Sequence, residues 1–160
     1  MIACLRPLSA ICFAGLLAAC ASAPSSNLGE LPRTPQASIE QLLQQAGDSQ
    51  SEQASLLRLS AADLAYQQKD LARASSILQQ VQLEGLKPAQ QIYASTLRAE
   101  LEMARNKPKA ALGAISHPSL ERLGELPVEQ QIRSQLVRAN ALQATGQTLA
   151  AARERAYIAP

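Results

Sequence analysis

The sequence predicts an all-α protein built from repeated pairs of helices, and three observations indicate this class. From residue 37 onward Ala, Leu, Gln, Glu and Arg dominate, and these residues favour helices, whereas β-branched residues are rare. Apolar residues do not alternate with polar ones as they do in half-buried strands. A unit of a long helix, a tight turn and a shorter helix also recurs along the chain. The 160 residues leave room for one such domain.

Local signals place the first helix. Ser38 and Gln41 have the spacing of a capping box, in which a side chain and a backbone N–H at the start of a helix bond reciprocally. We therefore expect a short helix from Ser38 to about Ala46, with Gly47 as its stop.

The first complete helix pair is expected next. Ser49 and Glu52 have the spacing of a second capping box, before a long helix that ends near residue 68. Residues 69–70 suggest a tight turn, followed by a helix over about 71–83. Pro88 is expected to close this pair.

The unit then repeats. An offset of 37 residues places the turn at 68–71 on 105–108 and matches Ala62 with Ala99, Leu64 with Leu101, Ala74 with Ala111 and Leu78 with Ile115. A third unit, around the turn Gly146-Gln147, matches the second at an offset of 40 or 41, and the sequence leaves both open. The extra residues fit a loop at 116–127.

Helix pairs of this length with small residues at recurrent sites resemble tetratricopeptide (TPR) repeats. In that family small residues let the paired helices approach closely, and here Ala62, Ala74, Ala99 and Ala111 occupy such sites. The aromatic positions of the family are mostly aliphatic in this chain, so the prediction is a TPR-like array over residues 37–160. Neighbouring pairs must stack because no pair can bury its apolar stripe alone.

The amino-terminal residues predict export and a lipid anchor. Residues 1–19 have one charged side chain, Arg6, then an apolar stretch of about ten residues, which is too short to span a bilayer and fits a signal peptide. The run Leu17-Ala18-Ala19-Cys20 resembles the lipobox of bacterial lipoproteins, in which the cysteine thiol receives a diacylglyceryl group. The alternative is an ordinary secretory signal with a chance cysteine.

The mature chain that this signal predicts starts at Cys20. Cys4 and Cys12 leave with the signal, so a single thiol remains, no internal disulfide can form, and acylation would occupy that thiol. Residues 20–36 contain Ser, Pro and Gly with few apolar residues, which predicts a mobile tether. The predicted lipid on Cys20 and the tether that follows it would therefore hold the helical domain at a membrane.

The carboxyl end of the sequence suggests an incomplete array. The apolar face of the last helix, with Leu149 and Ala156, has no further helix to cover it, and residues 157–160 lack the polar helix that caps a solenoid. We therefore expect residues 1–160 to be part of a longer protein, or this end to dock on another domain.

Catalytic chemistry is not indicated by the residues. His117 is the only histidine, and a metal site there would need Glu121 or Glu125 without any cysteine ligand, so a structural loop histidine is the preferred interpretation. Glu100 and Glu102 are two residues apart on a helix and point in different directions. We expect no catalytic residue, no metal and no cofactor, and the protein is not expected to be an enzyme.

Partner binding is the remaining expectation. After signal removal the net charge falls from +2 to +1, and the charges are scattered without interleaved aromatics, so nucleic acid is not an expected partner. The first helices of TPR-like pairs line the inner face of the array. Arginine makes forked, directional hydrogen bonds, and it supplies the candidate contact residues on these helices, which are Arg58, Arg98, Arg105, Arg133 and Arg138.

The lipobox, the short tether and the degenerate array together resemble the N-terminal part of the outer-membrane lipoprotein activators of class A penicillin-binding proteins. The resemblance implies a lipid anchor on Cys20 in the outer membrane, facing the periplasm, and stimulation of a peptidoglycan synthase. It also implies a larger C-terminal domain to which the main synthase contact is attributed. Ala21, rather than Asp, after the lipidated cysteine fits sorting to the outer membrane. The alternative is another TPR-type outer-membrane lipoprotein, acting in β-barrel assembly or pilus biogenesis; a periplasmic hydrolase would need catalytic residues beyond Pro160.

Overall fold

The structure, a computed structural model, describes residues 28–33 and 35–158, so residues 1–19 and Cys20 lie outside it. All regular secondary structure in the described part is helical and none is strand, which confirms the all-α prediction. Its elements in chain order are α1 (Ile39–Gly47), α2 (Ser51–Gln67), α3 (Leu71–Leu78), α4 (Pro88–Ala104), α5 (Pro108–Ala114), the 3-10 helix η1 (Pro118–Glu125), α6 (Val128–Ala144) and α7 (Thr148–Ile158).

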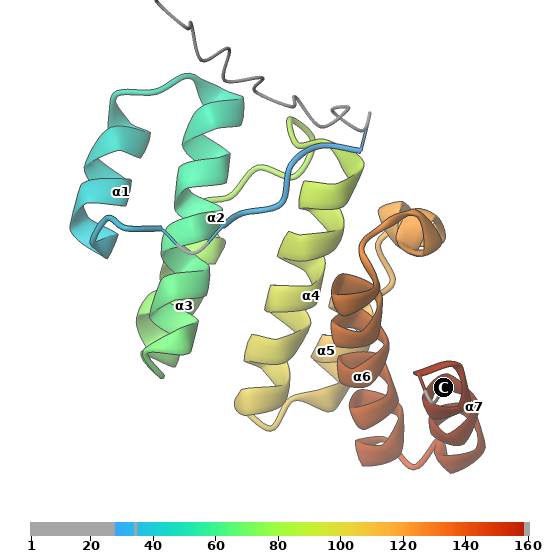
Figure 1. Cartoon of the computed structure of the whole chain (residues 1–160). Coiled ribbons are helices and arrows are strands. Elements are labelled where there is room, and N and C mark those ends of the chain that lie inside the picture. Colours follow the sequence, from blue (N-terminus) through green and yellow to red (C-terminus); the bar gives the residue numbers. More distant parts are fainter. Residues whose placement is uncertain (1–27, 34, 159–160) are drawn as a thin grey trace, which may run out of the picture.

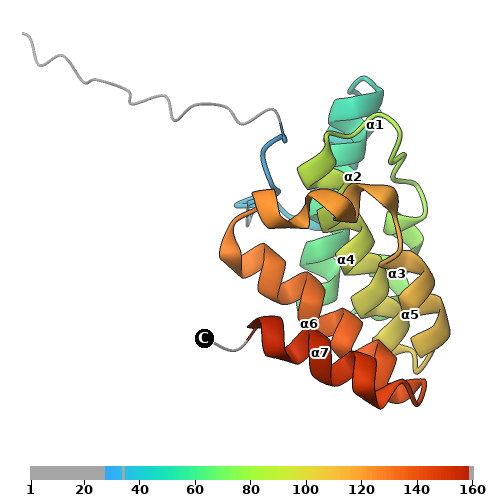
Figure 2. The ribbon, with the colours of Figure 1, turned by 90° about the vertical axis from the view of Figure 1, so that its right-hand side faces the viewer.

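Helices α2 to α7 form three successive antiparallel pairs, α2/α3, α4/α5 and α6/α7 (Figure 1). The first helices, α2, α4 and α6, are each 17 residues long and lie side by side in one layer. The second helices α3 and α5 lie behind α2 and α4, at the right in the side view of Figure 2, and α7 lies beside α6. Helix α1 packs against α2 at the start of the array. This arrangement is TPR-like, as the spacing predicts.

The three turns inside the pairs share one geometry and settle the repeat register. Each has a residue in the left-handed region, namely Lys69 (φ 66°), Asn106 (φ 58°) and Gly146 (φ 82°). In each, the next N–H bonds the carbonyl five residues earlier, from Asp70 to Ala65 (3.0 Å), Lys107 to Glu102 (2.8 Å) and Gln147 to Leu142 (2.9 Å). These bonds satisfy carbonyls that the helix end would leave open. The offsets are therefore 37 and 40.

Small residues recur where the paired helices cross. Ala62, Ala99 and Ala139 follow this register on the first helices, and Ala74, Ala111 and Ala151 follow it on the second; none is more than 1% exposed. A larger side chain at any of these sites would separate the helices because the interior has no spare volume. The predicted role of the four alanines is confirmed, and the third pair follows the same rule.

Some local predictions need correction. The capping box at Ser38 is present, with hydrogen bonds from Gln41 N–H to Ser38 Oγ (3.2 Å) and from Ser38 N–H to Gln41 Oε1 (2.9 Å). The capping box predicted at Ser49 and Glu52 is wrong, because Ser49 Oγ instead donates to Gln45 O (2.7 Å) and Gln50 occupies the N-cap.

The second helix of the first pair is also shorter than expected. Helix α3 ends at Leu78 rather than near Leu83, and i→i−3 bonds from Gln80 and Val81 tighten its last turn. Pro88 begins α4 rather than closing the preceding pair, since a missing N–H costs nothing at the first helical position.

The expected tether is partly docked. Residues 28–33, which we call the strap, run from the start of α4 across α2 towards α1 (Figure 1). Leu28 is buried against Ala89, Ile92 and Leu126, and Leu31 packs on the main core. The mobile segment predicted to reach residue 36 is therefore corrected for residues 28–33, which belong to the folded part.

The last pair leaves apolar side chains exposed. On α7 Leu149 is 67% and Tyr157 79% exposed, and Ala156 is exposed as well, so the predicted uncovered face is confirmed within residues 35–158. Val128, Ile132 and Leu136 extend this exposure along α6. None of the helices in the described residues has both the length and the apolar character needed to cross a bilayer.

Candidate partner-binding surface

The layer of first helices carries a row of polar side chains at one repeat position. Asp63 on α2, Glu100 on α4 and Asn140 on α6 are related by the offsets of 37 and 40. Equivalent positions in a repeat face the same way, so the three side chains form a ladder across the face that α2, α4 and α6 make together. Because Asp63 and Glu100 are neighbouring carboxylates in this ladder, a cation between them would stabilise both.

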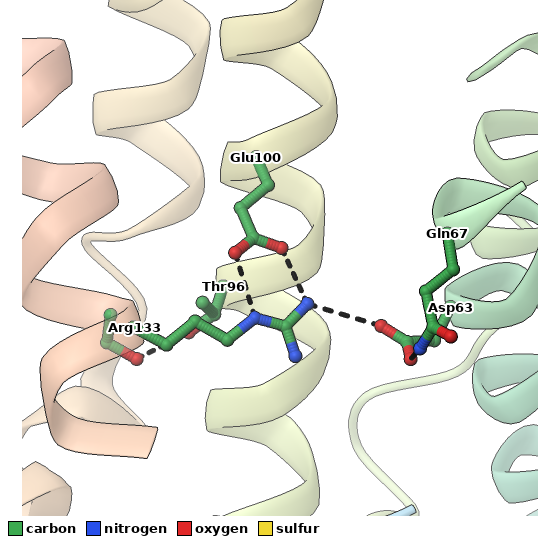
Figure 3. Close-up of polar contacts among 6 residues, drawn as sticks. Asp63, Gln67, Thr96, Glu100 and Arg133 are labelled. Atoms are coloured by element: carbon green, nitrogen blue, oxygen red, sulfur yellow. Dashed lines mark hydrogen bonds and ion pairs between the residues drawn. The ribbon is translucent and has the colours of Figure 1, made fainter. Parts of the chain in front are cut away.

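Arg133 supplies that cation from α6 (Figure 3). Its Nε donates to Glu100 Oε1 (2.8 Å) and its Nη2 to Glu100 Oε2 (2.6 Å), which is a forked pair, and Nη2 also donates to Asp63 Oδ1 (3.2 Å). Gln67 Nε2 donates to the other oxygen of Asp63 (2.6 Å). Such charge-assisted, bidentate pairs are the strongest of the side-chain hydrogen bonds. One arginine thus joins all three pairs.

The environment of Arg133 makes it a permanent cation. Burial lowers its pKa, but the hydrogen bonds and charge of Glu100 outweigh burial, and the pKa lies above its ordinary value. The guanidinium also lies over the Tyr93 ring, 4.9 Å from its centroid, where the ring quadrupole attracts a cation. Burial, and next the charge of Asp63, raise the pKa of Tyr93 to about 12.

A buried hydroxyl pair lies next to this network. Thr96 Oγ1 on α4 and Ser134 Oγ on α6 are 2.6 Å apart, and neither residue is more than 2% exposed. Among the described residues no buried side-chain nitrogen or oxygen lacks a partner. The α4–α6 contact is therefore specified by polar bonds as well as by apolar packing, because a helix shifted along its axis would leave these groups unpaired.

An open hollow of about 300 Å³ adjoins the network on the same face. Its lining comes from α2, α4 and α6 and consists of Tyr66, Glu100, Met103, Ala104, Arg133, Leu136, Val137 and Asn140. Met103 and Leu136 give its lining apolar surface, whereas Glu100, Arg133 and Asn140 give it polar atoms. This combination fits a protein side chain or short segment better than it fits a reaction, since the charged groups are already paired with each other.

The structure does not bring the five candidate arginines together. Arg133 alone lies at the centre of the α2–α4–α6 face. Arg98 and Arg138 are equivalent, at an offset of 40, and point towards the second-helix layer, where Arg98 lines a hollow with Leu78 of α3 and Arg138 pairs with Glu154 of α7 (3.4 Å). Their expected place on the inner face is corrected, because Arg138 follows Arg133 by five residues on α6, which turns it away by about 140°, and Arg98 holds the equivalent position on α4.

The remaining two arginines have other surroundings. Arg105 caps the end of α4, and its Nη2 donates to Leu71 O (3.3 Å), so it fastens the second pair to the first rather than facing outward. Arg58 is half-buried on α2, at the position that Ser95 holds on α4. Neither lies in the network around Arg133.

The partners of Arg133 were not among the residues predicted from the sequence. Glu100 and Glu102 do point apart as expected, with Glu102 near Arg105 (3.7 Å) and Glu100 on Arg133. The signal that identifies the network is the repeat itself, since Asp63 and Glu100 fall on one register position. Within residues 28–33 and 35–158 no three His, Cys, Asp or Glu residues gather as metal ligands do.

These features define a class, that of repeat proteins made of TPR-like helix pairs whose first helices are clamped into one polar face. A comparison with protein families then gives the particular family. The family described as LppC putative lipoprotein matches residues 32–160, which is most of the chain. The chain therefore belongs to this family, which confirms the resemblance and makes it a membrane-anchored lipoprotein. No curated protein and no solved structure matched the chain.

Proposed function

We propose that this chain is the N-terminal adaptor part of an outer-membrane lipoprotein that activates a class A penicillin-binding protein. The observation that carries the proposal is the family match over residues 32–160, which begins within the predicted tether, twelve residues after Cys20 of the lipobox. A lipoprotein with helix pairs and a polar face suits a role in protein contact rather than in catalysis. The protein is accordingly proposed to be a regulator of peptidoglycan synthesis and not an enzyme.

The proposed anchor is lipid on Cys20, inserted in the outer membrane with the domain in the periplasm. Several acyl chains on one residue give stable attachment, whereas one chain binds only marginally. Cys20→Ala is expected to move the protein from the membrane fraction to the soluble fraction. Ala21→Asp is expected to move it to the inner membrane, with Ala21→Ser as a matched control that stays in the outer membrane; a soluble wild-type protein would contradict the anchor.

The proposed contacts lie on two surfaces. One is the α2–α4–α6 face with the hollow at Met103 and Leu136. The other is the exposed apolar end with Ile132 and Leu149, which suits a larger neighbour such as a C-terminal domain of the same protein. Apolar surface of this kind marks interaction sites when it is contiguous. The two surfaces meet at Leu136.

The direct test uses the full-length lipoprotein and a purified class A synthase. Glycan polymerisation and peptide cross-linking are measured with and without the lipoprotein, together with binding of the two proteins. We expect stimulation of at least one activity and a measurable complex. The absence of both stimulation and binding would contradict the proposal. In that case, co-purification with β-barrel assembly or pilus components would favour the alternative outer-membrane scaffold.

A further inference from the structure

The strap is fixed to the array by a backbone hydrogen bond and by apolar burial. The N–H of Ala89, the second residue of α4, donates to Leu28 O (2.8 Å). Lys87, the N-cap of α4, makes no side-chain cap bond, so the Leu28 carbonyl satisfies a donor that the helix start leaves open. The Leu28 side chain is 9% exposed and packs on Ile92 and Leu126.

Gly29 permits this path for two independent reasons. Its φ is +97°, a conformation that residues with a Cβ rarely adopt. A Cβ built at position 29 would also lie 2.6 Å from Lys87 Cβ, which is closer than such atoms come. A side chain at position 29 would therefore lift the strap from the start of α4.

The strap leaves the array at one particular edge. The helix starts at Ser51, Pro88 and Val128, together with η1, define what we call the amino edge, which is uppermost in Figure 1. The turns at Lys69, Asn106 and Gly146 define the opposite turn edge, lowermost in Figure 1. The two edges are separated by the length of the 17-residue first helices, about 25 Å.

The docked strap shortens the reach from the lipid. From Cys20 to Leu28 is eight residues, which span at most about 28 Å, whereas the eighteen residues from Cys20 to Ser38 would span about 60 Å. With the strap docked, the amino edge is confined near the lipid, and the turn edge could reach the surface only with the tether almost fully stretched. Full stretching is entropically costly.

We infer that the amino edge is the membrane-facing edge of the molecule, and that the docked strap presents the turn edge away from the membrane. This rests on the lipid anchor of the proposed function. The surface that the amino edge faces is that of phospholipid headgroups, and the turn edge is the one presented to partners on the other side. Undocking of the strap would free the domain to move further and turn over.

The test measures the distance of each edge from a bilayer. With Cys20 acylated and Cys4 and Cys12 in the predicted signal peptide, an introduced cysteine is the only thiol within residues 20–160 that can take a fluorescent label. Glu52→Cys and Glu129→Cys label the amino edge, and Lys109→Cys and Gln147→Cys label the turn edge; all four positions are exposed. The lipidated full-length protein is placed in phosphatidylcholine vesicles that carry a headgroup energy acceptor.

Energy transfer from the amino edge should exceed that from the turn edge by about twofold, because about 25 Å separates them. Gly29→Val should remove most of this difference and lower transfer from the amino edge. Gly85→Val is the matched control, since a Cβ there meets nothing within 4 Å, and it should leave the difference intact. Hydrogen exchange of the Ala89 amide reports docking of the strap independently of any membrane. This amide should exchange slowly in wild type and fast in Gly29→Val.

The outcomes separate the orientation from the anchor. Equal transfer from both edges, or an unchanged difference in a Gly29→Val protein with exposed Ala89, would overturn the orientation. Leu28→Asp provides a second undocking variant if Gly29→Val fails to fold. Protein that does not float with vesicles would instead contradict the anchor on Cys20, and with it the proposed function.

Discussion

Arg133 is the residue that does most to define the face of this array. It pairs with Glu100 and Asp63 on two other helices, and all three side chains are largely shielded, being 26%, 16% and 12% exposed. Removing one partner from such a cluster leaves charge buried without compensation, which costs far more than the net gain from forming the pair. Surface ion pairs, in contrast, contribute little.

Arg133→Met is therefore expected to lower the free energy of unfolding by about 3 kcal/mol, because Asp63 and Glu100 lose their shared cation. Arg138→Met is the matched control: Arg138 lies on the same helix and pairs with Glu154, but its side chain is 53% exposed, and the expected loss is below about 1 kcal/mol. Urea unfolding of both variants measures this. Equal losses of unfolding free energy in the two variants would show that the three-helix cluster stabilises the fold no more than an exposed ion pair does.

Tyr93 gives a prediction for alkaline pH. Burial, followed by the charge of Asp63, raises the pKa of Tyr93 to about 12, so the folded protein keeps a proton that the unfolded chain releases near pH 10. The stability that this proton maintains is complete below about pH 10 and is lost as the pH rises through 12. The melting temperature of wild type should fall over this window.

Tyr93→Phe should reduce that fall, whereas Tyr157→Phe, at an exposed position, should not change it. Burial also raises the pKa of Tyr66, so part of the alkaline loss should persist in Tyr93→Phe. Melting curves at a series of pH values compare the three proteins. A pH profile of Tyr93→Phe identical to that of wild type would rule out this origin.

Arg133 was predictable as a candidate from its residue type and its place on a first helix, but its partners were not. Asp63 lies 70 residues away, and pairing at that separation depends on how the helix pairs stack. With an offset of 40 or 41 left open, the side of α6 that faces α4 was undetermined. Arg98 and Arg138 were assigned to the inner face because they lie on first helices, which does not say which side of the helix each side chain occupies.

At the scale of elements, equivalent positions on the first helices have different fates. Ile92 on α4 is 1% exposed because it packs with Leu28 of the strap and with Leu126, whereas its equivalent on α6, Ile132, is 37% exposed. The equivalent positions one helical turn further on differ in the same way, since Thr96 on α4 is buried and Leu136 on α6 is 47% exposed. The third pair therefore presents the face that the earlier pairs bury.

Ile92→Ala should lower the free energy of unfolding by about 3 kcal/mol through lost transfer energy and the cavity left behind. Ile132→Ala removes the same atoms at the equivalent position, and about 1 kcal/mol or less is expected from a partly exposed site. Chemical denaturation measures both. A large loss from Ile132→Ala in the isolated chain would mean that this face is already covered, for instance by a second copy.

Helix boundaries were predictable where the signal was local. The box at Ser38 formed because both of its side chains reach the facing N–H groups, whereas Ser49 had the right spacing but found a carbonyl at the end of α1 instead. The length of α3 was overestimated because Val81, which is buried, leaves the helix yet still packs on the core. Tertiary burial and helical periodicity cannot be separated in one short sequence.

At the scale of the whole molecule, burial declines towards the carboxyl end. Helix α4 buries ten of its 17 residues, whereas α7 buries Ala151 alone. Apart from the Arg133–Asp63 bond the pairs contact mainly their neighbours, and in such arrays stability is approximately a sum of local terms. The end pair should therefore open more easily than the middle.

Hydrogen exchange should show this gradient. Amides in α4 are expected to exchange close to the rate of global unfolding, and those in α7 much faster, because α7 is held mainly by α6. Mass spectrometry of peptides from the two helices gives the comparison. Equal protection in both would indicate one cooperative unit and would contradict the additive description.

The overall plan of repeated pairs was readable from the sequence because the alanine spacing and turns recur. The strap was not, since Ser, Pro and Gly around residues 28–33 indicate a linker by composition. Its docking depends on one backbone bond and on two leucines whose partners lie elsewhere in the chain. Composition describes how a segment behaves alone, whereas contacts with the surrounding helices determine whether residues 28–33 dock.

The shared geometry of the three turns has a consequence for the size of such a protein. Within each pair the two helices are joined by a turn with one left-handed residue and the same closing bond, while the difference in repeat length among the described residues falls between pairs, at η1. Whole pairs can thus be duplicated or deleted without altering the joints within them. Because packed helices lie about 8–10 Å apart, each added or deleted pair would change the length of the array by a step of about that size.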